Sequence, residues 1–198
     1  MLLLQQLFRS LLWRVETTEK VLYLTFDDGP IPEVTPWVLE ELQRHQAKAT
    51  FFVVGENVRK HPELLQRLQA GGHTVGNHTE HHVNGWNTPT RAYLREVQEC
   101  DRRVGSRLFR PPYGRIRLTQ IRALRKRFRI VMWDVLSKDY DRGIQPNECL
   151  QRVLRSARPG SIIVFHDSLK AEERLRHALP RVLGHFSELG YRFEALPA

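Results

Sequence analysis

Short apolar segments rich in β-branched and aromatic residues alternate with longer amphipathic segments along the chain. The apolar segments are typical of buried strands. They are VLYLTF (21–26), ATFFVVG (49–55), HTVGN (73–77), RLFR (107–110), RIVMW (129–133), SIIVFH (161–166) and YRFEAL (191–196). The segments between them have helical periodicity, over 33–46, 57–70, 89–104, 115–128, 145–157 and 172–189. Such alternation favours a parallel sheet, because parallel neighbours need a crossover connection that is usually a helix.

The alternation predicts an α/β fold, a distorted (β/α) barrel of about seven parallel strands that is similar to a TIM barrel. An open, doubly wound sheet is the alternative that the pattern leaves. A length of 198 residues suits one core, so we expect a single domain over 1–198. Within it, residues 1–19 are expected to form an N-terminal helical extension on the outside of the barrel, because Arg9 interrupts the leucine-rich start and no cleavage site follows.

The charge balance permits an anionic partner without requiring one. Lys and Arg total 31 against 22 Asp and Glu, which gives a formal net charge of +9. Much of the excess positive charge lies in residues 115–129. There the apolar residues recur at helical spacing and the arginines fill the other faces, as on a helix with a solvated face. No nucleic-acid motif accompanies these residues, and no apolar segment suits stable membrane insertion. We expect a monomer that neither binds nucleic acid nor inserts stably into a membrane.

Polar side chains stand where the apolar segments end. They are, in chain order, Asp27 and Asp28, His78, Arg110, Trp133 and Asp134, and His166 and Asp167. In a parallel barrel the carboxyl ends of all strands meet at one rim, where enzymes of this architecture build their sites. The sequence therefore predicts that these residues converge on a single site.

The histidines and the doubled aspartate suit one metal ion. His78 and His82 are four residues apart, so on a turn of helix both imidazoles project from one face. Asp28 can add a negative third ligand and leave positions open, as a catalytic zinc-type site requires. Asp27 is then free to act as general base. Taken alone, the histidine pair also fits a solvated surface, and the Asp-Asp-Gly-Pro segment also fits a capped turn.

Two other enzyme classes fit less well. A zincin would carry a glutamate where Thr79 stands, so a metalloprotease would lack its base. The two carboxylates of a glycosidase flank a bond at a separation of roughly 5–9.5 Å, whereas adjacent strand residues tend to face opposite ways.

Five segments in one order resemble the motifs of the polysaccharide deacetylase family, the metal-dependent carbohydrate esterases that share the nodulation chitooligosaccharide deacetylase homology domain. The segments are TFDDGP (25–30), HTEHH (78–82), RPPYG (110–114), WDVLSKDY (133–140) and IIVFHD (162–167). The resemblance implies a distorted (β/α) barrel and a hydrolase acting on carbon–nitrogen bonds other than peptide bonds. Its substrate would be an N-acetylated glycan of the peptidoglycan or chitin type, from whose N-acetylglucosamine sugars it removes N-acetyl groups.

The same resemblance implies a role for residues of each motif. Asp27 is the general base, which Arg110 orients. His166 is the general acid, which Asp139 holds and charges, and the Tyr113 backbone N–H helps to stabilise the oxyanion. The metal ligands are Asp28, His78 and His82. The sugar pocket is lined by Pro112, Trp133 and Phe165. The cofactor is one divalent metal ion, with zinc as the first choice and cobalt or nickel as alternatives.

The chain departs from the family pattern at three positions, all expected near the sugar. Tyr140 stands where the fourth motif usually has tryptophan, Leu136 where an aspartate is common, and Val164 where a leucine is usual. The alternative function is a catalytically silent carbohydrate-binding protein on the same barrel. With no export signal visible, the expected location is the cytoplasm by default, or the cell envelope if an export route exists.

Overall fold

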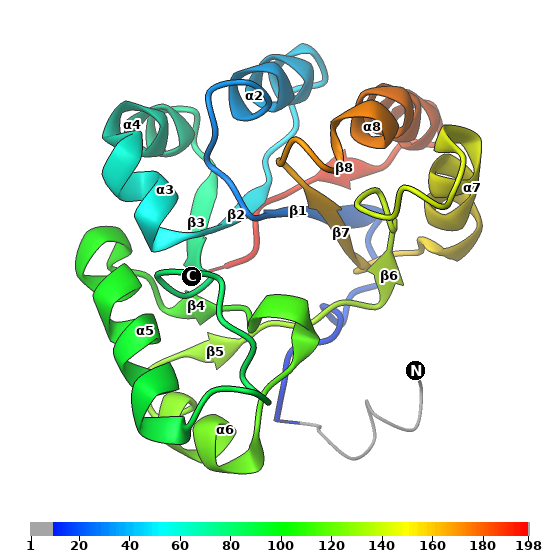
Figure 1. Ribbon diagram of the computed structural model, residues 1–198. Helices are drawn as coiled ribbons and strands as arrows, with labels where there is room; N and C mark the ends of the chain where they lie inside the picture. Colours follow the sequence, from blue (N-terminus) through cyan, green and yellow to red (C-terminus); the bar gives the residue numbers. More distant parts are fainter. Residues whose placement is uncertain (1–9, 198) are drawn as a thin grey trace.

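The computed structural model describes residues 10–197, in which strands and helices alternate as the sequence predicts (Figure 1). The strands are β1 Val21–Asp27, β2 Thr50–Val53, β3 Thr74–Asn77, β4 Leu108–Phe109, β5 Arg129–Ile130, β6 Val135–Leu136, β7 Ile162–His166 and β8 Arg192–Phe193. The helices are α2 Thr35–Arg44, α3 Gly55–Lys60, α4 Pro62–Ala70, α5 Thr90–Val104, α6 Leu118–Leu124, α7 Pro146–Ser156 and α8 Glu172–Glu188, with a 3₁₀ turn, η1, over Pro112–Gly114. Every predicted segment contains an element, and β6 is a strand that the pattern missed.

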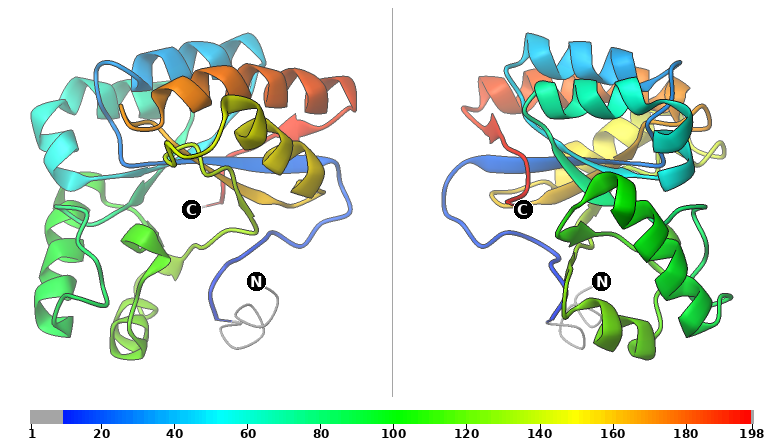
Figure 2. Two further views of the ribbon diagram at one scale, coloured as in Figure 1. Left: turned by 45° about the vertical axis from the view of Figure 1, so that its right-hand side comes forward. Right: turned by 90° about the vertical axis from the view of Figure 1, so that its left-hand side faces the viewer.

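The strands form one curved parallel sheet that the helices surround. Its order is β5-β4-β3-β2-β1-β7-β6, and β8 pairs with the start of β1. All seven residues of β1 are buried, as expected for a parallel strand covered on both faces. The helices lie around the outside of the curve (Figures 1 and 2). The prediction of a distorted α/β barrel with about seven parallel strands is confirmed.

The start of the described chain runs along the open side of the sheet. Leu12 forms a parallel bridge with Val131, just after β5, and Arg14 forms an antiparallel bridge with Ser161, just before β7. The predicted helical extension is therefore wrong for residues 10–19, because their backbone pairs with strand edges whose polar groups would otherwise lack these partners. The rest of that prediction, over residues 1–9, lies outside the described residues.

Aromatic packing between β1, β2 and β7 fixes which side chains face the helices. Phe26 stacks on Phe51 with ring centroids 4.9 Å apart, and on Phe165 at 6.1 Å. All three are fully buried in the cluster that the sheet shares with helix α2 and helix α8, and burial of each contributes roughly 2 kcal/mol. Because side chains alternate along a strand, the next residues, Asp27 and His166, point to the opposite face.

The predicted helix over 57–70 is divided into α3 and α4. The break lies at His61, which has φ −133° and ψ 61°, because Pro62 lacks an N–H and disfavours helical backbone in the residue before it. Among the helices between residues 10 and 197, none is both long enough and apolar enough to span a membrane.

Asp134 lies away from the rim at which the sequence pattern places it. The fifth strand ends at Ile130, earlier than predicted, so that Asp134 precedes β6 instead of following a strand. Its carboxylate accepts hydrogen bonds from the Ser161 hydroxyl at 2.9 Å and the Ile162 backbone N–H at 2.8 Å, at the amino end of β7. That prediction is therefore wrong, because Asp134 anchors the opposite end of the barrel.

Candidate active site and metal centre

The three predicted metal ligands are neighbours in space. Asp28 follows β1, and His78 and His82 lie in the loop after β3. Asp28 Oδ1 is 3.1 Å from His82 Nε2 and 3.8 Å from His78 Nε2, and one ligand atom from each residue lies within 4.8 Å of the others. One carboxylate oxygen and two imidazole nitrogens form the donor set of a catalytic zinc-type site.

The loop over residues 78–82 is not the turn of helix that the spacing predicts. Thr79 and His82 have positive φ values of 66° and 53°, which exclude a continuous right-handed turn. His78 Nδ1 lies 2.7 Å from the Arg110 carbonyl oxygen, to which it donates. With Nδ1 occupied in this way, His78 presents Nε2 to the ligand cluster.

The surroundings of Asp28 fit a bound cation. Its Oδ1 is buried, and within residues 10–197 no hydrogen bond satisfies that oxygen, which is unfavourable unless a cation binds there. Burial favours the neutral acid, but the contact with His82 and the charge of His166 hold the pKa of Asp28 well below its usual range. Burial lowers the pKa of His78 to about 4, so this imidazole is neutral, as a metal ligand must be.

Asp27, the last residue of β1, pairs with a buried arginine. Arg110 Nη1 donates to Asp27 Oδ1 and to Thr25 Oγ1, both at 2.7 Å, and Nη2 donates to the Met132 carbonyl at 2.9 Å. Arg110 is 0% exposed, and burial lowers its pKa against the opposing charge of Asp27. Asp27 Oδ2 remains on the side of the ligand cluster, 4.0 Å from His78 Nε2.

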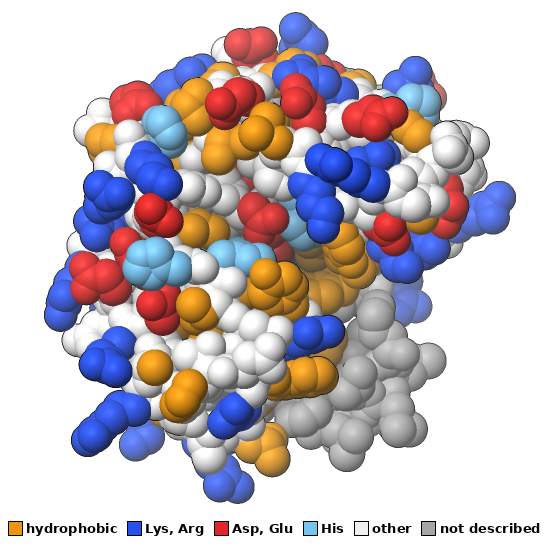
Figure 3. Space-filling view, viewed as in Figure 1, with side chains coloured by type: hydrophobic (Ala, Val, Ile, Leu, Met, Phe, Trp, Pro, Cys, Tyr) orange, Lys and Arg blue, Asp and Glu red, His pale blue; other side chains and the backbone are white. Residues whose placement is uncertain are grey.

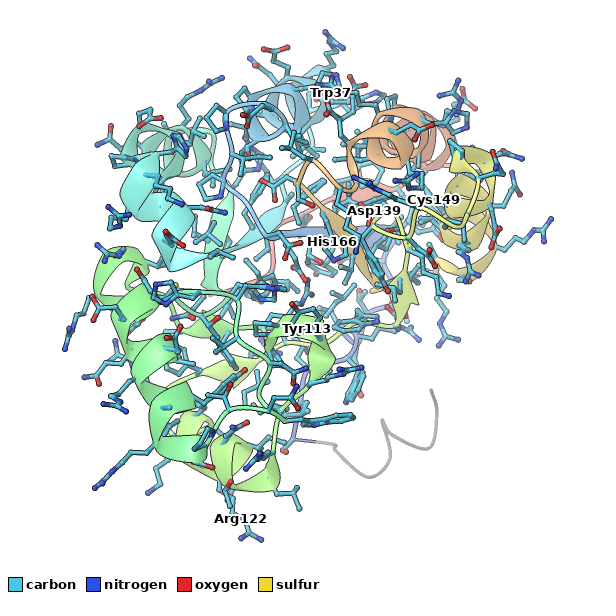
Figure 4. All side chains as sticks on the ribbon, viewed as in Figure 1. Trp37, Tyr113, Arg122, Asp139, Cys149 and His166 are labelled. Carbon is cyan, nitrogen blue, oxygen red and sulfur yellow. The ribbon has the colours of Figure 1, made fainter. Side chains whose placement is uncertain are left out.

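His166 ends β7 and is held by a second buried carboxylate. Asp139 Oδ1 accepts from His166 Nδ1 at 2.7 Å, and Oδ2 accepts the His166 backbone N–H at 2.7 Å. Burial disfavours the imidazolium, but the charge and hydrogen bond of Asp139, with Asp28 and Asp27 adding, raise its pKa to about 9. In Figure 4, Asp139 and His166 lie together and Tyr113 lies across from them. At neutral pH, His166 therefore carries a proton that Nε2 can donate.

Asp27, His166 and the three candidate ligands line one cavity of about 430 Å³ at the carboxyl ends of the strands, and Arg110 and Asp139 are buried behind them. Figure 3 shows it as a hollow with acidic and histidine side chains at its base. Tyr113, with a positive φ of 61°, lies on one wall with its ring 4.6 Å from that of His82. The three positions that depart from the family pattern also line the cavity; they are Leu136, Tyr140 and Val164.

The predicted sugar-pocket residues divide between cavity and core. Trp133 lines the cavity as predicted. The prediction is wrong for Phe165, which is fully buried and faces the helices because it alternates with the inward-facing His166. It is also wrong for Pro112, which is buried within η1 while Pro111 lines the cavity in its place.

Glu80, between the two histidines, anchors their loop. Its carboxylate is buried against α5, with Oε1 3.2 Å from Arg103 Nη2, and its backbone N–H donates to the Glu96 carbonyl at 3.1 Å. Its own carbonyl accepts the Glu56 N–H at 2.9 Å. Sequence reasoning assigned this acid no function, and the only signal was its position between two candidate ligands.

Asp167 is a second buried acid that sequence reasoning left without a role. Its carboxylate accepts the Gly29 N–H at 3.1 Å and the Thr35 hydroxyl at 2.6 Å, and its backbone N–H donates to the Asp27 carbonyl at 3.1 Å. Burial, with the charge of Asp28 adding, raises its pKa to about 8. Asp167 therefore ties the turn that carries the doubled aspartate to β7.

Replacing Gly29 with alanine should disrupt that turn. A Cβ at this position would lie 2.0 Å from Asp167 Oδ2, so we expect a loss of roughly 2–3 kcal/mol in the free energy of unfolding, measured by urea denaturation. Gly184→Ala is the matched control, because Gly184 lies on helix α8 and a Cβ there meets nothing within 4 Å. This substitution should raise the free energy of unfolding by up to about 1 kcal/mol. Equal urea midpoints for Gly29→Ala and the parent protein would contradict the assigned contact.

Comparison with known proteins places the chain among deacetylases. Residues 14–129 match the family model described as polysaccharide deacetylase. The chain is 35% identical over 183 residues to a peptidoglycan-N-acetylglucosamine deacetylase of Bacillus cereus, over 88% of this chain and 66% of that protein's length. It is 34% identical over 168 residues to a chitooligosaccharide deacetylase of Azorhizobium caulinodans, over 81% of this chain and 80% of that protein.

Solved structures extend the similarity beyond the region of the family match. A peptidoglycan N-acetylglucosamine deacetylase in complex with a naphthalenyl N-oxidanyl-benzamide superposes with a TM-score of 0.88 and 31% identity, covering 98% of this chain and 94% of that one. A pseudoenzyme of the CE4 family from Bacillus anthracis superposes with a TM-score of 0.82 and 27% identity, covering 93% of this chain and 66% of that one. The similarity in fold therefore includes β7 and His166.

Proposed function

Because the chain belongs to the polysaccharide deacetylase family, we propose that it is a metal-dependent hydrolase that removes N-acetyl groups from N-acetylglucosamine-type sugars of a polysaccharide or oligosaccharide. The observation that carries the proposal is the convergence of three ligand atoms, an ionised base and a charged acid in one cavity. The names of the relatives support peptidoglycan or a chitin-like glycan as substrate. The reaction breaks a carbon–nitrogen bond that is not a peptide bond.

Asp28, His78 and His82 would hold the divalent ion. Bound there, it supplies a Lewis acid for the acetyl carbonyl and for water. Zinc suits two imidazoles and one carboxylate, and cobalt and nickel suit them too, because affinity order alone does not select among these metals. The buried, unsatisfied Asp28 Oδ1 and the neutral His78 support this assignment.

The two ionised pairs divide the proton transfers between them. Arg110 occupies Asp27 Oδ1, so Oδ2 is the oxygen that accepts a proton from the attacking water. His166 Nε2 donates a proton to the departing nitrogen, because an amide nitrogen leaves only when protonated. The Tyr113 backbone N–H donates to the oxygen of the tetrahedral intermediate, and Trp133 lies against the sugar.

The catalytically silent alternative has a relative of its own in the Bacillus anthracis pseudoenzyme. Against it, this chain keeps the residues that we propose as base, acid and metal ligands. The monomeric state, the single-domain organisation and the compartment stay predictions.

The proposal is tested by acetate release from peptidoglycan fragments, chitooligosaccharides and small N-acetylated amino sugars. We expect release from at least one glycan, its loss with chelator and its recovery with zinc. Zinc at 100 times its dissociation constant should also stabilise the folded protein by about 2.7 kcal/mol, which raises the melting temperature. His78→Ala should lose both effects, because it removes a ligand.

His81→Ala is the matched control for that variant. His81 lies in the same loop, but its side chain is 56% exposed and pairs with Glu96 outside the ligand cluster, so both zinc effects should persist. Acetate release that chelator leaves unchanged would contradict metal dependence. Zinc stabilisation and glycan binding without acetate release from any glycan would favour the silent alternative.

A further inference from the structure

Two cations of the cavity wall have no acidic partner among residues 10–197. Arg115 follows η1, after β4, and Lys170 lies in the loop between β7 and α8; both line the cavity that contains Asp28 and His166. Neither takes part in an ion pair within the described chain. Figure 3 shows Lys and Arg side chains on both sides of the hollow.

Aromatic rings hold both cations at the wall. The Arg115 guanidinium lies 5.2 Å from the ring centroid of Trp86, and the Lys170 ammonium lies 5.6 Å from that of Tyr140. Cation–π contacts of this length orient a charge without neutralising it. Each cation therefore keeps hydrogen-bond donors for an anion.

The acidic residues at the base of the cavity already have positively charged partners. Arg110 neutralises Asp27, at 2.7 Å, and His166 neutralises Asp139, at 2.7 Å. Asp28 is the proposed ligand of a divalent ion. The two wall cations therefore face a cavity with no spare negative charge, and a neutral sugar would leave them unpaired.

We propose that Arg115 and Lys170 bind a carboxylate that the glycan carries beside its N-acetylated sugar. This inference rests on the proposed function and deepens it, because it assigns the cavity to amino-sugar polymers that bear acidic groups. Arginine can bind a carboxylate through two parallel hydrogen bonds, and lysine adds a point charge. The lactyl carboxylate of a muramic acid residue that carries no peptide and the carboxylate of a uronic acid offer the same chemistry, and the experiment distinguishes them.

The test compares acetate release from four oligosaccharides of equal length. They are a peptidoglycan glycan strand with free lactyl carboxylates, the methyl ester of the same strand, a chitooligosaccharide, and an oligomer that alternates N-acetylglucosamine with a uronic acid. For Arg115→Gln and for Lys170→Met we expect kcat/KM on a carboxylate glycan to fall by about fivefold. The factor by which kcat/KM falls on the ester and on the chitooligosaccharide should be at least threefold smaller. Added salt should reduce this difference between charged and neutral glycans.

Two matched variants control for the lowered net charge. Arg155→Gln and Lys126→Met each remove one exposed cation that does not line the cavity, so they should not discriminate between acidic and neutral glycans. If they discriminate as strongly as the wall variants, the inference is overturned. Equal loss on all four oligosaccharides in the wall variants would also overturn it.

Binding measured without turnover separates this inference from the proposed function. Titration calorimetry of Asp27→Asn with each oligosaccharide should give tighter binding of an acid glycan than of its ester, and Arg115→Gln in that background should remove the difference. Absence of acetate release from every glycan would contradict the proposed function, whereas equal binding of acid and ester would contradict only the carboxylate site. Preference for the lactyl or for the uronic oligomer supports the site and identifies its source.

Discussion

Asp27→Asn is expected to lower acetate release by about a thousandfold while zinc remains bound. Removal of a general base typically costs a factor of about 10²–10⁴ in rate. Asparagine keeps the shape of the side chain and an oxygen for Arg110, but it cannot accept a proton from water. The ligands Asp28, His78 and His82 are unchanged, so the zinc content of the purified variant should equal that of the parent protein.

The same substitution should also lower stability, because it leaves Arg110 charged and without its counter-charge. That guanidinium is 0% exposed and its Nε already has no hydrogen-bond partner among residues 10–197. An uncompensated buried charge costs about 3 kcal/mol or more, so the urea midpoint should fall. Rates are therefore compared per folded molecule, with circular dichroism as the measure of folding.

Asp101→Asn provides the matched control for Asp27→Asn. Asp101 is also buried and paired with an arginine, Arg127, but it lies on α5 outside the cavity. This variant should keep full acetate release. If Asp27→Asn keeps more than about a tenth of the parent rate, the base is another group.

The second large effect concerns the pH range in which His166 can act as general acid. His166 has a pKa of about 9, so acetate release should decline at alkaline pH as its proton is lost. Asp139→Asn removes the charge that sustains this proton, and burial then favours the neutral imidazole. The alkaline limb of the rate profile should move to lower pH, with release at pH 8 far below that of the parent protein.

His166→Ala should reduce amide hydrolysis by about a hundredfold or more. The loss should be much smaller for 4-nitrophenyl acetate, whose leaving group departs without a proton. A purely structural role would reduce both reactions alike, so equal losses on the two substrates would contradict assignment of His166 as the acid.

The raised pKa also predicts how stability depends on pH. A histidine whose pKa rises on folding stabilises the folded protein fully below its unfolded value of 6.5, and that contribution is lost as pH rises through about 9. Asp139→Asn should therefore destabilise the protein more at pH 6 than at pH 10. Urea denaturation at the two pH values measures the difference.

The positions of the strands were predictable because buried strands are short, continuous apolar segments. The location of the site at one rim of the barrel was predictable because parallel strands all end on the same side of the sheet. The conformation of the loop after β3 was not predictable from the four-residue spacing of His78 and His82. One of its bends is held locally, where Asn77 Oδ1 accepts the Thr79 N–H at 2.9 Å. The orientation of His78 depends on a segment 32 residues away, where the Arg110 carbonyl accepts from His78 at 2.7 Å. A contact between such distant segments leaves no periodic signal.

The residues around the cavity also show what local sequence patterns do not predict. Phe165 and His166 are adjacent in sequence, yet strand alternation sends one to the core and the other to the cavity. Asp139 lies in an irregular segment after β6 and was assigned only through the motif that contains it, because no spacing relates it to His166. The role of Asp167 was likewise hidden, since its partner Gly29 is 138 residues away in the sequence, in the turn after the neighbouring strand β1.

The pairing of residues near position 12 with segments next to β5 and β7 has a consequence for synthesis on the ribosome. Leu12 and Arg14 leave the exit tunnel before β1, but their partners Val131 and Ser161 emerge only after β5 and α7, respectively, have been made. Contacts of such long sequence separation form slowly. Until then the edges they cover stay exposed to other chains, so this barrel can be completed only after Ser161 has left the ribosome.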